Sequence, residues 1–322
     1  AVLDDFQPDV VHLNNIQYHL TPSIILEINK WRKETKKECK IVYTTHDYQL
    51  VCPSHGMFDV DMKPCERCLD GHYIHCLQTK CLKNSRAKSL LGTLDGYMWK
   101  YSKAYSYVDA YICCSYFLKS KLDTQKRFRD KTIGLHNFKK EMPHLDNIQK
   151  RGYVLEFGHL SRDKGTDTLL EVAKKMPNTE FVFIGYGPSV DKMKDIPNVK
   201  YLGFKTGEEL YRIIAEAAIS VCPSEWYENC PYSVMESVLL GTPVVGAKMG
   251  GIPELIEPGK TGELFEAGNA EDLMKAIKKV LQTQDILERY TKNCSQVKYE
   301  TTESYYIKLM KIYRGEKNVE QI

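Results

Sequence analysis

The stretch YVLEFGHLSRDKGTDTLLEVAKKMPNTEFVFIG, residues 153–185, contains two short apolar runs separated by a helix-like segment. The runs at 153–158 and 180–185 are rich in β-branched and aromatic residues, and both end in glycine. Between them, residues 166–176 carry apolar side chains spaced by three and four positions. A strand, a helix and a second strand in this order predict a βαβ unit with parallel strands.

The same alternation of strand-like and helix-like segments extends on both sides of this stretch. Further strand-like runs are residues 199–204, 219–224 and 243–247 in the second half, and 9–15, 40–47, 110–116 and 131–137 in the first. These runs are nearly continuous in apolar character, as expected for strands that helices cover on both faces. We therefore expect an α/β protein built from two doubly wound, Rossmann-like domains.

The length of 322 residues agrees with two domains, at roughly 100–200 residues for each. The polar stretch 141–152 contains proline and glycine and separates the two alternating series, which predicts an interdomain linker. We expect the first domain over residues 1–145, with a Cys-rich insertion at 52–81, and the second over 150–298. A last helix within 299–322 is expected to cross back to the first domain. Because the first domain lacks the strand and glycine-rich turn that usually open such a fold, we expect it to be incomplete at its N-terminus.

The composition excludes several classes of protein. Apolar residues make up 43% and charged residues 27%, which is typical of a globular protein. Lys and Arg number 45 against 42 Asp and Glu, and a net charge of +3 is too small to argue for a nucleic-acid partner. No apolar run reaches the length of about 18 residues that a membrane-spanning helix needs. Eleven cysteines without a basic-then-apolar leader indicate reduced thiols and a cytoplasmic location.

Two carboxylates lie eight positions apart in the stretch SEWYENCPYSVMESV, residues 224–238. Pro231 lies between Glu228 and Glu236 at a position typical of the first helical residue, which puts Glu228 on a loop and Glu236 inside a helix. The amides and the positive dipole end at the start of this helix can hold an anion or a polyol. Acids at this spacing are also common by chance, so the flanking motifs decide whether they form a site.

Several segments, in the same order, resemble retaining glycosyltransferases of family 4, which have the GT-B fold of two Rossmann-like domains facing a cleft. Residues 224–256 resemble the Glu-x7-Glu region of that family, and GHLSRDKGTDTLL at 158–170 resembles its strand–turn–helix segment. FIGYGP at 183–188 resembles the glycine turn on the nucleotide side. FQPDVVHLNN at 6–15 resembles the PDVVH segment, and TTHDYQLVCP at 44–53 resembles the histidine loop. The resemblance covers nearly the whole chain.

The resemblance implies a retaining, metal-independent hexosyltransferase. Its donor would be a nucleotide sugar, a UDP-sugar rather than a GDP-sugar, and its acceptor a saccharide or lipid-linked saccharide in polysaccharide or glycolipid synthesis. No cofactor is required, because a cation and helix-end amides can stabilise the departing diphosphate. The implied catalytic residues are Glu228, Lys164 and His46, and the implied donor-binding residues are Glu236, Asn229, Cys230, Pro231, Tyr232, Gly158, His159, Arg162, Gly185 and Gly187. His12 and Asn14 would lie on the acceptor side, with a structural role as the alternative.

Two departures from the family pattern leave other functions open. His159 stands where the family usually has Arg, and a neutral imidazole stabilises a leaving group less than a guanidinium does, although Arg162 can compensate. The glycine-rich loop near the start is missing, so we expect it to have been truncated or to come from a partner chain. A non-catalytic nucleotide-sugar-binding or scaffold subunit is the first alternative, and a GT-B sugar-nucleotide epimerase is the second.

Two segments outside this pattern suggest further properties. In the Cys-rich insertion, Cys65, Cys68, Cys76 and Cys81 can supply a tetrahedral thiolate site. We expect structural zinc there, with buried thiols or an iron–sulfur cluster as alternatives. The helix expected at 86–107 carries basic and aromatic residues. It can lie on the anionic inner face of a membrane, within reach of a lipid-linked acceptor, or it can pack its apolar side on its own domain.

Overall fold

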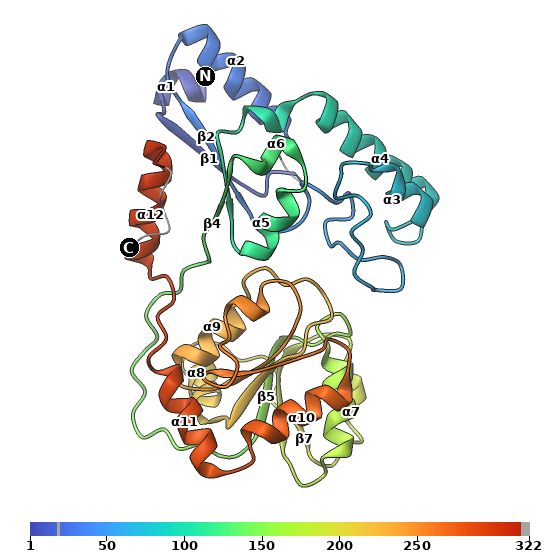
Figure 1. Cartoon of the computed structure of the whole chain (residues 1–322), viewed down its shortest axis with the longest axis vertical. Helices are drawn as coiled ribbons and strands as arrows, with labels where there is room; N and C mark the ends of the chain where they lie inside the picture. Colours follow the sequence, from blue (N-terminus) through green and yellow to red (C-terminus); the bar gives the residue numbers. More distant parts are fainter. Residues whose placement is uncertain (18–19, 317–322) are drawn as a thin grey trace. The chain divides into compact units, whose positions relative to one another are not determined.

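The computed structural model describes residues 1–17 and 20–316 (Figure 1). The chain divides into two compact units, each built around a parallel sheet, which confirms the expected α/β class. Unit 1 consists of Ala1–Asn137 together with the segment that begins at Glu303, and unit 2 is Phe138–Thr302. None of the helices in the described part of the chain combines the length and the apolar character that crossing a membrane requires.

The polar stretch 141–152, expected to be a linker, lies within unit 2. Hydrogen bonds attach both Lys139, just before this stretch, and Lys150, near its end, to that unit. The Lys139 amide donates to the Glu300 carbonyl, and Lys150 Nζ donates to Thr242 Oγ1 at 2.8 Å. Because these partners belong to unit 2, the boundary falls at Asn137, earlier than the expected residue 145.

Unit 1 contains a four-stranded parallel sheet with the strands in chain order. The strands are β1 (Val10–Asn14), β2 (Lys40–Thr45), β3 (Ala110–Cys113) and β4 (Thr132–Gly134). The helices before and between them are α1 (Val2–Phe6), α2 (Ser23–Thr35), α5 (Tyr116–Leu122) and α6 (Lys126–Arg129). In the register of the sheet, Asn14 lies opposite Thr44. The residues that follow β1 and β2 therefore meet at one edge of the sheet.

The last helix, α12 (Thr302–Arg314), packs on unit 1. Its Ile312 is buried with Val42, Ile112 and Leu135, which come from β2, β3 and the residue after β4. The apolar spacing of the helix explains this packing, since Leu309 and Tyr313 lie on the same side and contact the same cluster.

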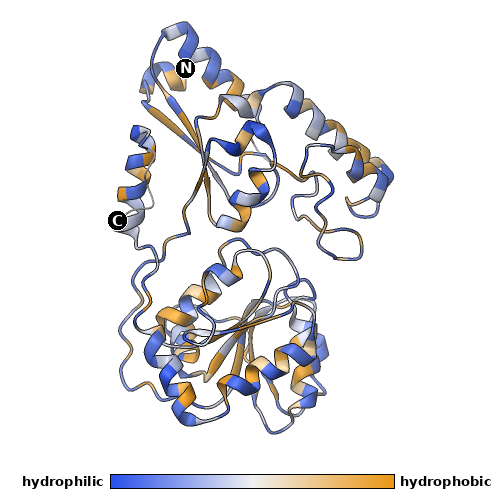
Figure 2. Cartoon of the chain, viewed as in Figure 1, coloured by the Kyte–Doolittle hydropathy of each residue, from blue (hydrophilic) through white to orange (hydrophobic). Residues whose placement is uncertain are grey.

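Unit 2 contains a six-stranded parallel sheet in the order β10-β9-β8-β5-β6-β7. The strands are β5 (Val154–His159), β6 (Phe181–Tyr186), β7 (Val199–Tyr201), β8 (Ile219–Cys222), β9 (Val244–Ala247) and β10 (Gly262–Phe265). The helices are α7 (Thr166–Lys175), α8 (Gly207–Glu216), α9 (Tyr232–Leu239), α10 (Ala270–Val280) and α11 (Gln284–Cys294), with 3₁₀ turns η2 (Val190–Met193) and η3 (Ile252–Glu254). The strands are predominantly hydrophobic (Figure 2).

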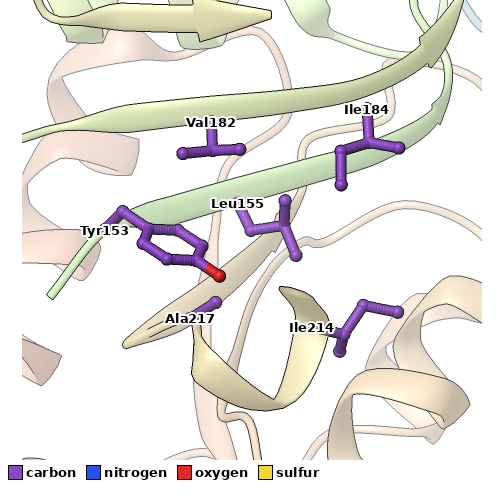
Figure 3. Packing of buried hydrophobic residues seen from close by; sticks show 6 residues of the cluster. All are labelled: Tyr153, Leu155, Val182, Ile184, Ile214 and Ala217. Carbon is purple, nitrogen blue, oxygen red and sulfur yellow. The ribbon is translucent and has the colours of Figure 1, made fainter. Parts of the chain in front are cut away.

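Apolar contacts between the strands and α8 hold this sheet together (Figure 3). Leu155 of β5 packs with Val182 and Ile184 of β6, and Ile214 of α8 lies against them. Burying a side chain of this size contributes about 1.5–3 kcal/mol. The chain leaves β5 towards β6 on one side, and later passes from β8 to β9 on the other. The strand order therefore changes direction between β5 and β8 although all strands are parallel, and α/β proteins usually bind ligands at such a point.

The long connection between β2 and β3, which includes the Cys-rich insertion at 52–81, contains no strand among its described residues. It includes α3 (Ile74–Thr79), α4 (Arg86–Tyr101) and the 3₁₀ turn η1 (Ala104–Tyr107). Ser85 caps α4, because its hydroxyl accepts a hydrogen bond from the Lys88 amide. The single helix expected at 86–107 is therefore a four-turn α-helix followed by a short turn.

Candidate active site

A pocket of about 290 Å³ lies at the carboxyl ends of β5 and β8, the point at which the strand order of unit 2 changes direction. Six of the residues singled out from the sequence line it, namely Gly158, His159, Lys164, Glu228, Pro231 and Glu236. Four further polar residues that sequence reasoning missed also line it, namely Glu156, Cys222, Ser224 and Ser233. The tertiary structure thus gathers the separate motifs of the second domain into one cavity.

Lys164 and Glu228 form an ion pair in this pocket. Lys164 Nζ lies 2.5 Å from Glu228 Oε1, and the two side chains are 30% and 16% exposed. Ser224 Oγ donates a second hydrogen bond to the same carboxylate oxygen at 3.2 Å. The ammonium group also lies 5.1 Å from the ring centroid of Trp226. A cation and a carboxylate are therefore held at the pocket wall with little freedom to turn away.

The backbone at Glu228 is fixed by the glycine turn that follows β9. The Gly251 amide donates to the Glu228 carbonyl at 2.7 Å. At Gly250, where φ is +60°, an added Cβ would lie 2.0 Å from the same carbonyl oxygen. Only glycine allows this approach, because any side chain would collide with the backbone. The turn at 250–251 therefore supports the loop that carries the first carboxylate.

The second carboxylate, Glu236, lies on α9 and pairs with Lys139. Their side chains are 14% and 18% exposed, and Lys139 Nζ also lies 5.5 Å from the ring centroid of Tyr232. Lys139 was not among the predicted residues. Nothing near it in the sequence indicates this role, since its partner is 97 positions away.

The start of α9 differs slightly from the expected one. Pro231 is the residue before the first helical position, Tyr232, rather than the first helical residue itself. Cys230 is buried, with its sulfur 3.9 Å from the sulfur of Met235, and it does not line the pocket. Asn229 lies on the same loop, and Tyr232 is 45% exposed.

Glycines bring the ends of β5 and β6 unusually close together. An added Cβ on Gly185 would lie 1.8 Å from the Gly158 carbonyl oxygen, and one on Gly187 would lie 2.2 Å from that of Leu160. All three glycines have positive φ, at +128°, +135° and +152° for Gly158, Gly185 and Gly187. Glycine is required here because other residues rarely adopt this backbone conformation.

A second pocket of about 200 Å³ adjoins the first at Gly158 and His159. Its wall includes Tyr186 and Phe204, whose ring centroids lie 6.0 Å apart, and the ring of His159 meets Tyr186 edge-on at 5.4 Å. Arg162 is exposed and lines neither pocket.

Glu156 is a buried carboxyl group on β5 at the bottom of the first pocket. Thr166 Oγ1 donates to its Oε1 at 2.8 Å, while its Oε2 has no hydrogen-bond partner among the described residues. Burial raises the pKa of Glu156 to about 8, so the neutral acid is favoured at pH 7. An acidic residue within an otherwise apolar strand run was the signal that could have identified it.

The residues singled out in unit 1 lie at the ends of β1 and β2. Asn14 Oδ1 is 3.1 Å from His46 Nε2, so the two predicted residues are in direct contact. His12 lies deeper, with Nε2 2.7 Å from Thr44 Oγ1 and Nδ1 2.7 Å from Tyr313 Oη. Loss of solvation lowers the pKa of both histidines, which favours neutral rings. With both ring nitrogens engaged, His12 links β1 to β2 and α12.

The four cysteines considered for zinc line one small cavity in the insertion, together with Cys52. Cys81 Sγ donates to Cys76 Sγ at 2.8 Å, which lowers the pKa of the Cys76 thiol. Burial raises the pKa of Cys68 to about 12. Within residues 1–17 and 20–316, no three His, Cys, Asp or Glu side chains are grouped so that they could hold a metal ion. The expected zinc therefore stays a prediction.

Comparison with known proteins identifies the class and the family. Solved structures with the same arrangement include HepE of Anabaena in complex with UDP and glucose, with a TM-score of 0.68, 16% identity and coverage of 98% of this chain and 80% of that one. Sucrose-phosphate synthase of Thermosynechococcus elongatus also has a TM-score of 0.68, with 18% identity over 98% of this chain and 75% of that one. The fold is thus of the GT-B class. The family model "Glycosyl transferases group 1" matches residues 137–297, and the chain belongs to this family.

Two curated relatives illustrate how much of the chain is matched. Sulfoquinovosyl transferase SQD2 of Arabidopsis thaliana is 33% identical over 42% of this chain and 28% of its own length. The amylovoran biosynthesis glycosyltransferase AmsK of Erwinia amylovora is 30% identical over 47% of this chain and 41% of its own length. The chain spans less than half of the length of these two relatives.

Proposed function

We propose that this chain is a retaining, metal-independent glycosyltransferase that uses a nucleotide-sugar donor. The observation that supports this most directly is that two carboxylates, Glu228 and Glu236, line one pocket at the carboxyl ends of β5 and β8. Each of them forms an ion pair with a lysine. This combination provides positive charge for a diphosphate and carboxylate oxygens for sugar hydroxyls. A carboxylate accepts hydrogen bonds from hydroxyl groups, and these bonds are stronger than those between neutral groups.

The departing nucleotide diphosphate would be stabilised by Lys164 and by the amides at the start of α9. Both are preorganised, because Lys164 is already held at the pocket wall and α9 begins at Tyr232 beside it. Fixed donors of this kind stabilise developing charge without reorganisation of the solvent. When a diphosphate binds, Lys164 would exchange its contact with Glu228 for phosphate oxygens. Glu228 would then be free to accept hydrogen bonds from the donor sugar.

The remaining donor contacts follow from the position of each group. Glu236, oriented by Lys139, would accept hydrogen bonds from the ribose hydroxyls. The adjoining pocket with Tyr186 and Phe204 suits a flat nucleobase, which stacks well on aromatic rings. A UDP-sugar is our first choice of donor. The absence of side chains at Gly158, Gly185 and Gly187 would leave room for the diphosphate between the two pockets. His159 lies there in place of the Arg that is usual in the family that the sequence resembles.

The acceptor would be a saccharide or a lipid-linked saccharide in polysaccharide or glycolipid synthesis. The relative named for amylovoran biosynthesis and the plant sulfoquinovosyl transferase support this choice. Retention of configuration follows from the resemblance to family 4. In that mechanism the acceptor hydroxyl attacks C1 from the side of the leaving diphosphate, whose oxygen accepts the hydroxyl proton as the C1–O bond breaks. The role of His46 stays a prediction, as does a cytoplasmic location at the inner face of a membrane.

A panel of UDP-, GDP- and ADP-sugars, tested by thermal shift and nucleotide release, would test this function. A ligand at about 100 times its Kd adds about 2.7 kcal/mol to the free energy of unfolding, which is a clear shift in Tm. We expect one donor to stabilise the parent chain but not the variant Glu236→Ala. The same donor should stabilise the control Glu266→Ala, because the Glu266 carboxylate is exposed and lies outside the pocket. Absence of a shift with every donor would contradict the donor site.

Nucleotide release separates the proposed function from its alternatives. Release that depends on acceptor indicates transfer. Stabilisation by a donor without release, even with mixed acceptors, would favour a non-catalytic binding or scaffold subunit, or a chain that needs a partner. Conversion of the sugar without any acceptor would indicate an epimerase.

A further inference from the structure

Helix α4, which follows the Cys-rich insertion, exposes its large apolar side chains, whereas an ordinary surface helix buries them. Its large apolar side chains point outward, and we call them the α4 stripe: Leu90 (43% exposed), Leu91 (67%), Leu94 (56%), Met98 (51%) and Tyr101 (74%). At 100° per residue these five side chains share an arc of about 100° on one side of the helix. Figure 1 shows α4 next to α3 at one side of unit 1, and Figure 2 shows hydrophobic residues along α4.

The opposite side of α4, which packs on the insertion, carries small and polar residues, and Tyr97 at its edge packs against Tyr73. Ser89 and Thr93 are buried. The Leu82 amide donates to Ser89 Oγ at 3.1 Å, and Thr93 Oγ1 donates to the Tyr73 carbonyl at 3.2 Å. An added Cβ on Gly96 would lie 2.9 Å from the Tyr73 ring, so glycine is needed for this close packing.

Packing within unit 1 therefore does not explain the α4 stripe. Large apolar side chains are usually buried, and a continuous exposed set on one helix indicates a surface that is covered by something else. Of the two alternatives left open by the sequence, packing on its own domain therefore accounts for Tyr97 but not for the five residues of the α4 stripe.

The charges around α4 favour an anionic partner. Residues 71–107 contain one acidic residue, Asp95, and six basic ones, namely Lys80, Lys83, Arg86, Lys88, Lys100 and Lys103. Asp95 is used inside the unit, where it accepts hydrogen bonds from Gln17 and Trp99. On the helix, Arg86 and Lys88 are exposed and flank the α4 stripe on its two sides.

We propose that α4 is an interfacial helix that binds an anionic lipid surface. The α4 stripe would enter the boundary between head groups and acyl chains, and the flanking cations would contact lipid phosphates. An apolar arc bordered by Lys and Arg is typical of helices that lie in the plane of a membrane. Basic residues next to such a helix add attraction to anionic lipids, which salt weakens. This proposal does not depend on the donor or on the reaction catalysed by the chain.

Vesicle flotation with the full chain tests the proposal. We expect the parent to float with phosphatidylcholine vesicles that contain about one third phosphatidylglycerol, and to float much less with phosphatidylcholine alone or at high salt. The double variant Leu91→Glu with Leu94→Glu should lose at least ten-fold in vesicle affinity. The triple variant Lys83→Glu, Arg86→Glu and Lys88→Glu should lose the preference for anionic vesicles. Because all five side chains are exposed, the Tm of these variants should match that of the parent.

Two control variants carry the same chemical changes elsewhere in unit 1. Phe6→Glu alters another exposed apolar residue (79% exposed), and Lys30→Glu with Lys36→Glu reverses two exposed charges on or next to α2. Both should float like the parent. The proposal is wrong if the folded parent does not float with anionic vesicles, or if the stripe variants float as well as the parent. It is also wrong if the α4 stripe joins two copies of the chain instead. In that case light scattering would show a dimer, the double variant Leu91→Glu with Leu94→Glu would be a monomer, and neither would bind vesicles.

Discussion

Glu236 accepts a hydrogen bond from Lys139 Nζ, although 97 positions of sequence separate the two residues. Both side chains are largely shielded from solvent, and Glu236 lines the pocket. Lys139 therefore holds the carboxylate of α9 in one orientation. This contact belongs to unit 2 alone, because the segment after Asn137 packs with the second sheet rather than with the first.

Replacing Lys139 by Met should weaken donor binding. The variant keeps the apolar stem but removes the cation that orients Glu236, so the KM for the donor should rise about ten-fold, equivalent to about 1.4 kcal/mol. We expect kcat to change by less than three-fold, because Lys139 does not contact the leaving group. Steady-state kinetics with the identified donor would measure both. Lys140→Met, at the exposed neighbouring residue, serves as the control, and an unchanged KM in Lys139→Met would refute the orienting role.

Replacing Lys164 by Met should affect catalysis more than binding. Loss of one preorganised group that stabilises developing charge typically lowers kcat by about 10²–10³. Lys164→Arg should recover part of this loss, since it restores the cation. Single-turnover transfer assays would separate the chemical step from donor binding. The control is Lys174→Met on the exposed side of α7, and a parent-like rate in Lys164→Met would exclude a role at the diphosphate.

Glu156 should make the stability of unit 2 depend on pH. Its pKa is about 8 in the folded chain, above the value near 4.5 of an unfolded Glu, so the folded state binds more protons between these two values. Stability should therefore fall by a few kcal/mol as pH rises from 4.5 to above 8. Glu156→Gln keeps the shape and stays neutral, so its Tm should fall less over this range. Thermal unfolding from pH 5 to 9 would measure the difference, and parallel curves for the two proteins would show that Glu156 is not a buried neutral acid.

Gly250→Ala should disturb the loop of Glu228. The new Cβ would collide with the Glu228 carbonyl at 2.0 Å, in addition to the strain of φ +60°. Gly259→Ala provides a matched control, because φ there is +80° but no atom lies within 4 Å of an added Cβ. Positive φ alone costs of order 1–3 kcal/mol, so Gly259→Ala should be mildly destabilised. Gly250→Ala should lose more stability and also donor affinity in titration calorimetry. Equal effects of the two substitutions would mean that the contact with Glu228 is unimportant.

Structural zinc in the insertion can be tested directly by metal analysis. We expect the purified chain to hold about one zinc per molecule, bound by thiolates, and to release it when the thiols are modified. Cys65→Ser and Cys68→Ser should each lose zinc and lower the Tm. Cys39→Ser, at a buried cysteine outside the thiol cavity, should keep the metal. A metal-free chain that unfolds normally would leave buried thiols as the explanation of the cysteine cluster.

The sequence predicted the architecture because the alternation of apolar runs and helix spacing is local. Residues 153–185 cover β5, α7 and most of β6, and the other strand-like runs contain the remaining strands except β10 (Gly262–Phe265), which was not predicted. The turns that contain Gly185 and Gly250 could also be predicted, because each is part of a short glycine-containing sequence motif. The boundary at Asn137 was not predictable in this way, because the polar stretch after it is attached to unit 2 by contacts with distant residues.

The sequence by itself therefore determined the α/β class, the order of the elements and the segments that carry Lys164, Glu228 and Glu236. These properties depend on side-chain periodicity and short turns, which act over a few residues. Only the tertiary structure paired Lys139 with Glu236, placed Glu156 at the bottom of the pocket and turned the α4 stripe outward. Those outcomes depend on which distant segments pack together and exclude water, and no local pattern of residues encodes them.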